Sequence, residues 1–304
     1  MSESNLADTA EYYPPNEPVP RRHSSPSVRV EMAALSHPGH VRPNNEDHYF
    51  VARVERKLEA ILTNLPSEHL PEQTTEAGYG LLVADGMGGR AAGEVASRSA
   101  IHLFLELILD TPDWIMRFQG ELGGQVMQRM IERFRQIDAA LSEWSQSDPD
   151  LAGMGTTMTL ACSVGADLLT IHVGDSRAYL LRQGKLRRLT HDQTIAQELA
   201  DCGSIEPDEV STHRFRHVLT QALGRRGGEV RVEVGRIKLT DGDQLLLCTD
   251  GLTEMVADEL IAKELKSAGT AEEICRALIE RALENGGRDN VTVAVARYHF
   301  PPEN

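Results

Sequence analysis

Short apolar segments joined by tight turns occupy the middle of the chain, and this feature constrains the fold most. Strands are predicted there at residues 156–164, 168–173, 178–182 and 186–189. The turns between them contain Gly165-Ala166-Asp167 and Gln183-Gly184. Turns this short connect antiparallel neighbours, whereas parallel strands need long crossover connections. The sequence therefore predicts antiparallel sheets and not the alternating strands and helices of a doubly wound fold.

Helical periodicity marks the segments that would cover these sheets. Helices are predicted at about 93–109, 122–144, 194–202 and 270–284, and further strands at about 28–33, 49–54, 79–84, 230–239, 244–248 and 290–298. In the second helix, apolar residues recur from Val126 to Leu141 at helical spacing, and Trp144 beyond them is predicted to be a core residue. Thr270 and Glu273 form a capping box for the last helix. The prediction is an α+β domain.

The first 27 residues differ in composition from the rest. They include five prolines among Ser, Glu and Asn, with few residues that could be buried, which predicts a disordered tail. Residues 28–304 are predicted to form one domain, and 55–77 a charged insert within it. Trp114 is predicted to be in its core.

Charge and apolar content exclude several classes of protein. The chain has 46 Asp and Glu against 31 Lys and Arg, a net charge of −15, so a nucleic-acid partner is not expected. The apolar stretch at 101–109 is too short to cross a bilayer, and the four cysteines form no CxxC pair. We expect a soluble, cytoplasmic, monomeric protein without a membrane anchor.

Acidic residues recur where an apolar strand meets a turn. They are Asp85, Asp175, Asp250 and Asp289, and the pair Glu46-Asp47 precedes another strand. If these strand ends converge, only cations would relieve the repulsion, and oxygen ligands suit Mg²⁺ or Mn²⁺. Two such ions can activate a water for attack on phosphorus. Gly86 would let its carbonyl approach a cation, and Arg42 offers a planar fork to phosphate.

Six motifs carry a resemblance to a known family. They are R42-P-N-N-E-D47, V83-A-D-G-M-G-G89, G155-T-T157, V173-G-D-S-R177, T249-D-G-L252 and R288-D-N-V-T-V293. In this order, over about residues 28–298, they resemble the bacterial-type members of the type 2C, metal-dependent Ser/Thr phosphatases (PPM). The resemblance implies an α-β-β-α sandwich of two antiparallel sheets flanked by helices, with a metal cleft at one end.

The resemblance also implies roles for individual residues. Asp85 would bridge two Mn²⁺ or Mg²⁺ ions, with the Gly86 carbonyl and Asp47 on one side and Asp250 and Asp289 on the other. Glu46 would hold a metal-bound water, Arg42 would bind the substrate phosphate, and Asp175 would bind a third, weaker metal with Asp250 and Glu254. Residues 193–224 would form a flap over the cleft.

One position departs from part of that family. Some members have a histidine after Asp-Gly that protonates the leaving group, and this chain has Met87. The proton would come from a metal-bound water. His37, His40, His48 and His172 are alternatives near the motifs, but each is more readily explained as a surface or packing histidine.

The implied activity is hydrolysis of phosphoserine and phosphothreonine in proteins by a metal-bridging hydroxide. Its partners would be phosphorylated proteins, including a Ser/Thr kinase or its substrates. One alternative is a catalytically inactive phosphoprotein-binding module, which would usually have lost one of the ligands Asp47, Asp85, Asp250 and Asp289. Another is a nuclease or small-molecule phosphoesterase, disfavoured by the lack of a basic track.

Overall fold

The structure is a computed structural model that describes residues 28–56, 62, 76–88, 92–110, 121–225 and 228–301. The predicted tail (1–27), Trp114 and most of the predicted insert (55–77) lie outside the described residues. In the described part of the chain, no helix is long and apolar enough to cross a membrane.

Two antiparallel sheets form the centre of the domain. The first has the order β1-β11-β10-β7-β8, and the second β2-β3-β5-β6-β9, with β4 paired to the end of β3. The strands are β1 (Arg29–His37), β2 (Asp47–Arg56), β3 (Glu76–Met87), β4 (Gly155–Thr156), β5 (Met158–Val164), β6 (Asp167–Val173), β7 (Arg177–Arg182), β8 (Lys185–Arg188), β9 (Glu233–Lys238), β10 (Gln244–Cys248) and β11 (Val291–His299). The prediction of antiparallel sheets from the tight turns is confirmed.

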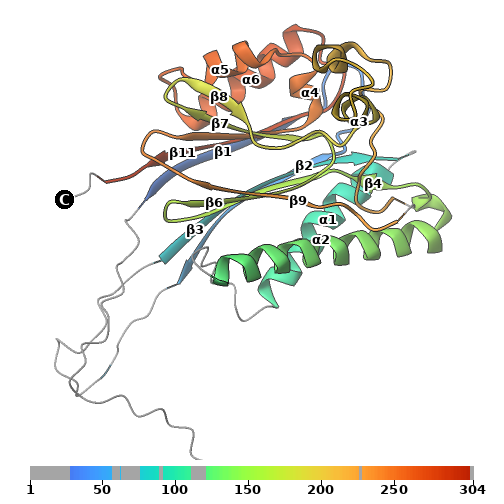
Figure 1. Cartoon of the computed structure of the whole chain (residues 1–304), viewed down its shortest axis with the longest axis horizontal. Coiled ribbons are helices and arrows are strands. Elements are labelled where there is room, and N and C mark those ends of the chain that lie inside the picture. Colours follow the sequence, from blue (N-terminus) through green and yellow to red (C-terminus); the bar gives the residue numbers. More distant parts are fainter. Residues whose placement is uncertain are drawn as a thin grey trace, which may run out of the picture.

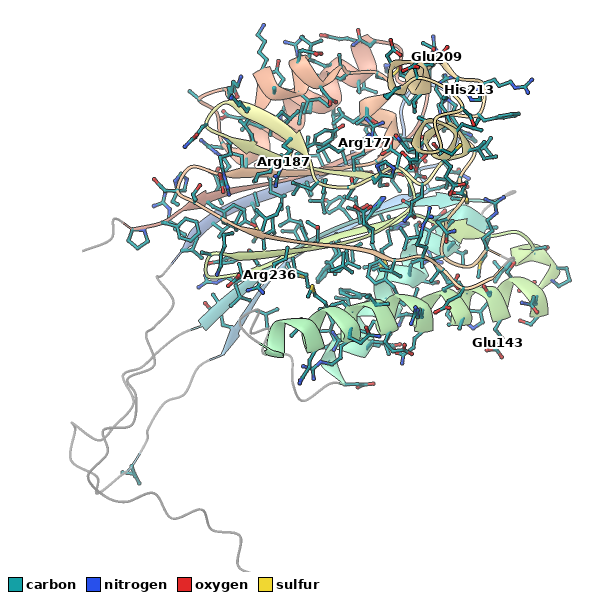
Figure 2. The ribbon with its side chains drawn as sticks, viewed as in Figure 1. Glu143, Arg177, Arg187, Glu209, His213 and Arg236 are labelled. Atoms are coloured by element: carbon teal, nitrogen blue, oxygen red, sulfur yellow. The ribbon has the colours of Figure 1, made fainter. Side chains whose placement is uncertain are left out.

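Helices cover the outer face of each sheet (Figure 1). The helices of the described residues are α1 (Ala92–Leu109), α2 (Glu121–Ser147), α3 (Ile195–Asp201), α4 (Asp250–Thr253), α5 (Asp258–Leu265) and α6 (Ala271–Glu284), with 3₁₀ turns η2 (Pro149–Leu151) and η3 (Pro207–Thr212). α1 and α2 lie below the second sheet, and α4, α5 and α6 lie above the first. The layers are therefore α-β-β-α, as the resemblance implied.

Three apolar clusters hold these layers together. One joins α1 and α2 to the second sheet, one joins α5 and α6 to the first, and a third fills the space between the sheets. In the third cluster, Leu81 and Val83 of β3 meet Leu245 and Leu247 of β10. Alternate residues of one strand thus face opposite layers, which is why both sheets are apolar on both faces.

The prediction for Trp144 was wrong. The buried stripe of α2 is Val126, Met130, Phe134, Ile137 and Leu141, as its periodicity predicted. Near the end of the helix it is Ser145 that is buried, while Trp144 is exposed. The direction of the last turn, which the sequence pattern does not specify, decides which side chain faces the sheet.

One further local prediction was wrong, and one helix was missed. Asp85-Gly86 was expected to form a turn after a strand, but β3 continues through Met87 and pairs with β4. Helix α5 was not predicted, although its Ile261 and Leu265 are buried against α6. The end of β3 depends on pairing with a strand distant in sequence, and α5 depends on packing against α6, so local patterns indicated both elements weakly.

Antiparallel pairing places the acidic strand ends at one edge. β3 pairs with β5 and β5 with β6, so β3 and β6 run in the same direction and end together. β2 starts opposite the end of β3. In the other sheet, β10 ends where its antiparallel partner β11 begins.

Candidate metal centre

Three of the predicted acidic residues come from the second sheet. Asp47, the first residue of β2, is paired directly across the strands with Asp85 of β3. Asp175 follows the end of β6 after Gly174. The backbone of Asp85 is fixed from the other side, because its N–H donates to Thr157 Oγ1 at 3.0 Å and its carbonyl accepts from Thr157 N at 2.9 Å.

The first sheet supplies the other two acidic residues. Asp250 starts α4 immediately after β10, and Asp289 precedes β11. Thr249 Oγ1 donates to Asp47 Oδ2 at 2.8 Å and accepts from Thr292 N at 3.0 Å. This hydroxyl therefore joins the two sheets at the centre of the acidic group.

Burial makes these carboxyl groups weaker acids than usual. Burial first, and then the charges of Asp250 and Asp289, raise the pKa of Asp47 to about 7, although hydrogen bonds from Thr292 and Thr249 lower it. The pKa of Asp250 rises to about 6, mainly by burial and by repulsion from Asp289. Burial also raises the pKa values of Asp85 and Asp175 well above the usual range. Such shifts are typical of carboxylates that need a cation to ionise together.

Two carboxylate oxygens without hydrogen-bond partners indicate whether these residues could bind a cation. Asp47 Oδ1 and Asp250 Oδ1 are buried and have no hydrogen-bond partner. An acceptor in that state costs free energy unless a cation or a donor reaches it. The donors are all oxygens, as Mg²⁺ and Mn²⁺ prefer. Among the described residues, no three or more His, Cys, Asp or Glu side chains are already grouped closely enough to hold a metal ion. The chemistry of the residues fits divalent cations.

Gly86 is required by close packing as well as by its position in the site. A Cβ there would lie 2.1 Å from the Gly93 carbonyl oxygen and 2.7 Å from that of Glu46. The Gly86 N–H donates to the Glu46 carbonyl at 3.1 Å. The Glu46 carboxylate lies against Gly93 at the start of α1, where the positive end of the helix dipole favours it.

Arg42 lies at the edge of the acidic group. Its Nη2 donates to Asp289 Oδ2 at 2.6 Å, and more than half of its side chain is exposed. The hydrogen bond and the charge of Asp289 raise the pKa of the guanidinium. Arg42 therefore contacts a predicted metal ligand, and its remaining N–H groups are available to a phosphate.

Asn290, which was not among the predicted site residues, fixes the loop that carries Arg42 and Glu46. Its Oδ1 accepts from Glu46 N at 2.7 Å, and its Nδ2 donates to the carbonyls of Pro38 and Asn44. Asn290 belongs to the R288-D-N-V motif, which was the available signal. Only the fold shows that the hydrogen-bond partners of Asn290 are residues about 250 positions earlier in the chain.

Glu254, a suggested helper for a third metal, has other partners here. Its Oε2 lies 3.4 Å from Arg216 Nε and 3.6 Å from His217 Nε2, both in the predicted flap. These contacts hold the flap beside α4, and Figure 1 shows α3 near α4 at the same end of the sandwich. Helix α3 begins after its N-cap Thr194, close to its predicted start.

Two of the four candidate histidines make structural contacts in the interior. His48 Nδ1 lies 2.9 Å from Ser97 Oγ of α1. His172 is fully buried, with Nδ1 2.8 Å from Thr159 Oγ1 and Nε2 3.0 Å from the Gly174 carbonyl. His37 accepts from Gly39 N, and its ring lies edge-on to that of His40. These contacts support the packing role that the sequence favoured.

His172 predicts a loss of stability in acid. Burial lowers its pKa from 6.5 to about 4, so the unfolded chain takes up a proton at a higher pH than the folded chain does. The neutral His172 ring contributes to the free energy of unfolding above pH 6.5, and this contribution is lost as the pH falls toward 4. We expect protonation of His172 in the unfolded chain to lower the free energy of unfolding by about 2 kcal/mol between pH 7 and pH 5. Guanidinium unfolding of His172→Gln should show a smaller loss over that interval; an equal loss in both proteins would contradict the prediction.

The fold and the site together define a two-sheet sandwich with a buried carboxylate centre at one edge. Residues 69–289 match the family model described as protein phosphatase 2C. The chain is 36% identical over 213 residues to the serine/threonine phosphatase stp of Listeria monocytogenes, covering 70% of this chain and 82% of that protein. The chain belongs to the protein phosphatase 2C family.

Relatives from Mycobacterium tuberculosis extend the comparison. The serine/threonine protein phosphatase PstP is 39% identical over 268 residues, covering 88% of this chain and 45% of PstP. This chain therefore spans less than half the length of that relative. The crystal structure of PstP/Ppp matches with a TM-score of 0.70 and 36% identity, covering 89% of this chain and 99% of that one. The PstP catalytic domain in complex with two manganese ions matches with a TM-score of 0.68 and 34% identity, covering 90% of this chain and 100% of that one.

Proposed function

We propose that this chain is a metal-dependent protein phosphatase that hydrolyses phosphoserine and phosphothreonine in other proteins. The observation that carries the proposal is the convergence of five aspartates from both sheets, with raised pKa values at four of them (Asp47, Asp85, Asp175 and Asp250) and two buried oxygens without partners. Family membership supports the same activity.

Asp47, Asp85, the Gly86 carbonyl, Asp250 and Asp289 would hold two divalent ions, and Asp175 a third. Mn²⁺ is favoured by the manganese complex of the PstP catalytic domain, and Mg²⁺ has the same ligand preferences. When bound, such ions supply an acidified water as the nucleophile for direct attack on phosphorus and offset the negative charge of the phosphoryl group.

The chain's own residues would orient the reactants. Arg42 would hold two phosphate oxygens with the N–H groups that Asp289 leaves free, and Asp289 fixes the guanidinium at the edge of the site. Glu46, whose pKa is raised by burial, would accept a hydrogen bond from a water at the site. Its backbone is held by Asn290, so the carboxylate is positioned before substrate binds.

The leaving alkoxide needs a proton, and Met87 supplies none. Both ring nitrogens of His172 are engaged by Thr159 and Gly174, and His48 contacts Ser97 through Nδ1. We assign this role to water in the centre, as the motifs implied. The partners proposed for the chain are phosphorylated proteins, among them a Ser/Thr kinase or its substrates.

Hydrolysis of a phosphothreonine peptide tests the proposal. Purified protein is incubated with the peptide in Mn²⁺, in Mg²⁺ and in EDTA, and released phosphate is measured. Phosphate release that requires metal is expected. No release in either metal would favour the inactive phosphoprotein-binding module, and release from nucleotide or DNA alone would favour the other phosphoesterases.

Substitution of Arg42 separates substrate binding from chemistry. Arg42→Ala is expected to raise KM for a phosphopeptide by about tenfold with a smaller change in kcat, because the fork binds phosphate in the ground and transition states alike. Arg42→Lys should recover only part of the loss, since an ammonium lacks the fork. Arg276→Ala, at an exposed arginine paired with Glu272 on α6, is the control. A fall in kcat with unchanged KM would contradict the assignment.

A further inference from the structure

Gln193 is a buried polar residue that joins the loop carrying Asp175 to two later segments of the chain. It is 3% exposed, and all its polar groups are hydrogen-bonded. Its N–H donates to the Gly174 carbonyl at 2.8 Å, and its Oε1 accepts from Gly174 N at 2.8 Å. Its Nε2 donates to the Arg231 carbonyl at 3.1 Å, and its carbonyl accepts from Thr220 N at 2.8 Å. Gln193 thus contacts Gly174, the segment that ends the flap, and the segment before β9.

The side-chain oxygen of Gln193 replaces a strand partner at the point where β6 ends. The pairing of β6 with β5 ends at Val173, so the next N–H, that of Gly174, needs another acceptor. That amide is buried, and leaving it without an acceptor would cost about 1–3 kcal/mol. Gly174 has φ +113°, and a Cβ there would lie 2.6 Å from Thr157. The loop therefore has a specific conformation that the Gln193 amide holds.

The residue before Gln193 fixes the other side of the same loop. Asp192 accepts from Arg177 Nη2 at 2.7 Å and from Arg177 Nε at 3.0 Å. Both Asp192 and Arg177 lie largely out of solvent. Two consecutive residues therefore hold the loop at Gly174 and at Arg177, on either side of Asp175.

Asp175 is the predicted cation ligand whose loop these contacts hold directly, whereas Asp85 is linked to that loop only through Thr157, whose Oγ1 lies 2.8 Å from Ser176 Oγ. The backbone of Asp85 is held by Thr157, and Asp47 is held by Thr249. Neither contact involves Gln193. A change at Gln193 should therefore affect the position of Asp175 more than the positions of the other ligands.

We propose that Gln193 is a positioning residue that holds the Asp175 loop in the conformation in which Asp175 binds a divalent cation. The proposal rests on the role of Asp175 given under the proposed function. Under this proposal, Gln193 controls the cation affinity of the site at Asp175 and not that of the other sites. Residues that hold ligands in this indirect way typically contribute about 10- to 100-fold to metal affinity.

Calorimetric titration of the intact chain with Mn²⁺ tests the proposal, with thermal unfolding in EDTA to verify that each variant is folded. Gln193→Met has a side chain of similar length and removes both side-chain hydrogen bonds. Gln221→Met is the matched control: Gln221 Oε1 accepts from Arg231 N at 2.9 Å, so this variant also loses a contact to Arg231 but none to Gly174. Asp175→Asn identifies the part of the binding curve that depends on Asp175.

We expect Asp175→Asn to lose a weaker Mn²⁺ component, and Gln193→Met to weaken that same component by at least about tenfold. The tighter component should stay within about twofold, and Gln221→Met should match the unsubstituted chain.

Three results would overturn the proposal: a normal titration of Gln193→Met, equal weakening of both components in Gln193→Met, or a weaker component that persists in Asp175→Asn. Calorimetry measures cation binding alone. A chain that failed to hydrolyse phosphopeptide could still give the expected result, so failure of this proposal is distinguishable from failure of the proposed activity.

Discussion

Asp250→Asn is expected to lower kcat/KM for a phosphothreonine peptide by more than about a thousandfold, because removing a ligand should exceed the roughly 10- to 100-fold cost of removing an outer partner. Asp250 Oδ1 is buried without a partner, and its carboxyl lies beside Asp85 and Asp289. An amide keeps the shape of the side chain but removes its negative charge. The loss should therefore come from weakened cation binding and not from altered packing.

Phosphate release at increasing Mn²⁺ concentrations measures this effect. Asp110→Asn is a suitable control, because Asp110 is exposed just after α1 and outside the site. Partial recovery at high Mn²⁺ would agree with weakened binding. Full activity of Asp250→Asn at low Mn²⁺ would remove Asp250 from the proposed centre.

The same substitution is expected to stabilise the protein in EDTA. The pKa values of Asp47 and Asp250 rise from 3.8 to about 7 and about 6 on folding. Below pH 3.8 both states hold these protons, so the shifts have no effect. As the pH rises through the interval up to about 7, the unfolded chain ionises first, and the free energy of unfolding falls. The loss should be on the order of a few kcal/mol at pH 8.

Thermal unfolding at pH 5 and pH 8 tests this second prediction. In EDTA at pH 8, Asp250→Asn should unfold several degrees above the unsubstituted chain, and the difference should shrink at pH 5. Added Mn²⁺ should stabilise the unsubstituted chain more than the variant, because cation binding favours the folded state. A lower unfolding temperature for Asp250→Asn in EDTA would show that the carboxylate stabilises the metal-free fold.

Local sequence was sufficient for most of the fold. Two hairpins were predicted from their turn residues, Gln183-Gly184 and Gly165-Ala166-Asp167. The prediction succeeded because the conformational requirements of a tight turn are strict and depend only on the residues in it. The stripe from Val126 to Leu141 produced a helix that faces the second sheet, since its spacing fixes one face. The prediction for Trp144 was wrong and α5 was missed, because at both places the neighbouring elements decide which side chains are buried.

The amino-acid sequence alone predicted the chemistry of the proposed cation site: carboxylates at the ends of apolar strands, an arginine fork before them, and no histidine after Asp85-Gly86. Their arrangement required the tertiary structure. Asp85 and Gly86 continue β3 because Asp47 and Thr156 pair with them from distant strands. Gln193 and Asn290 acquired roles only when their distant partners came within hydrogen-bond distance. A pattern in the chain specifies residue types and local conformation, whereas burial and charge repulsion depend on which strands the fold brings together.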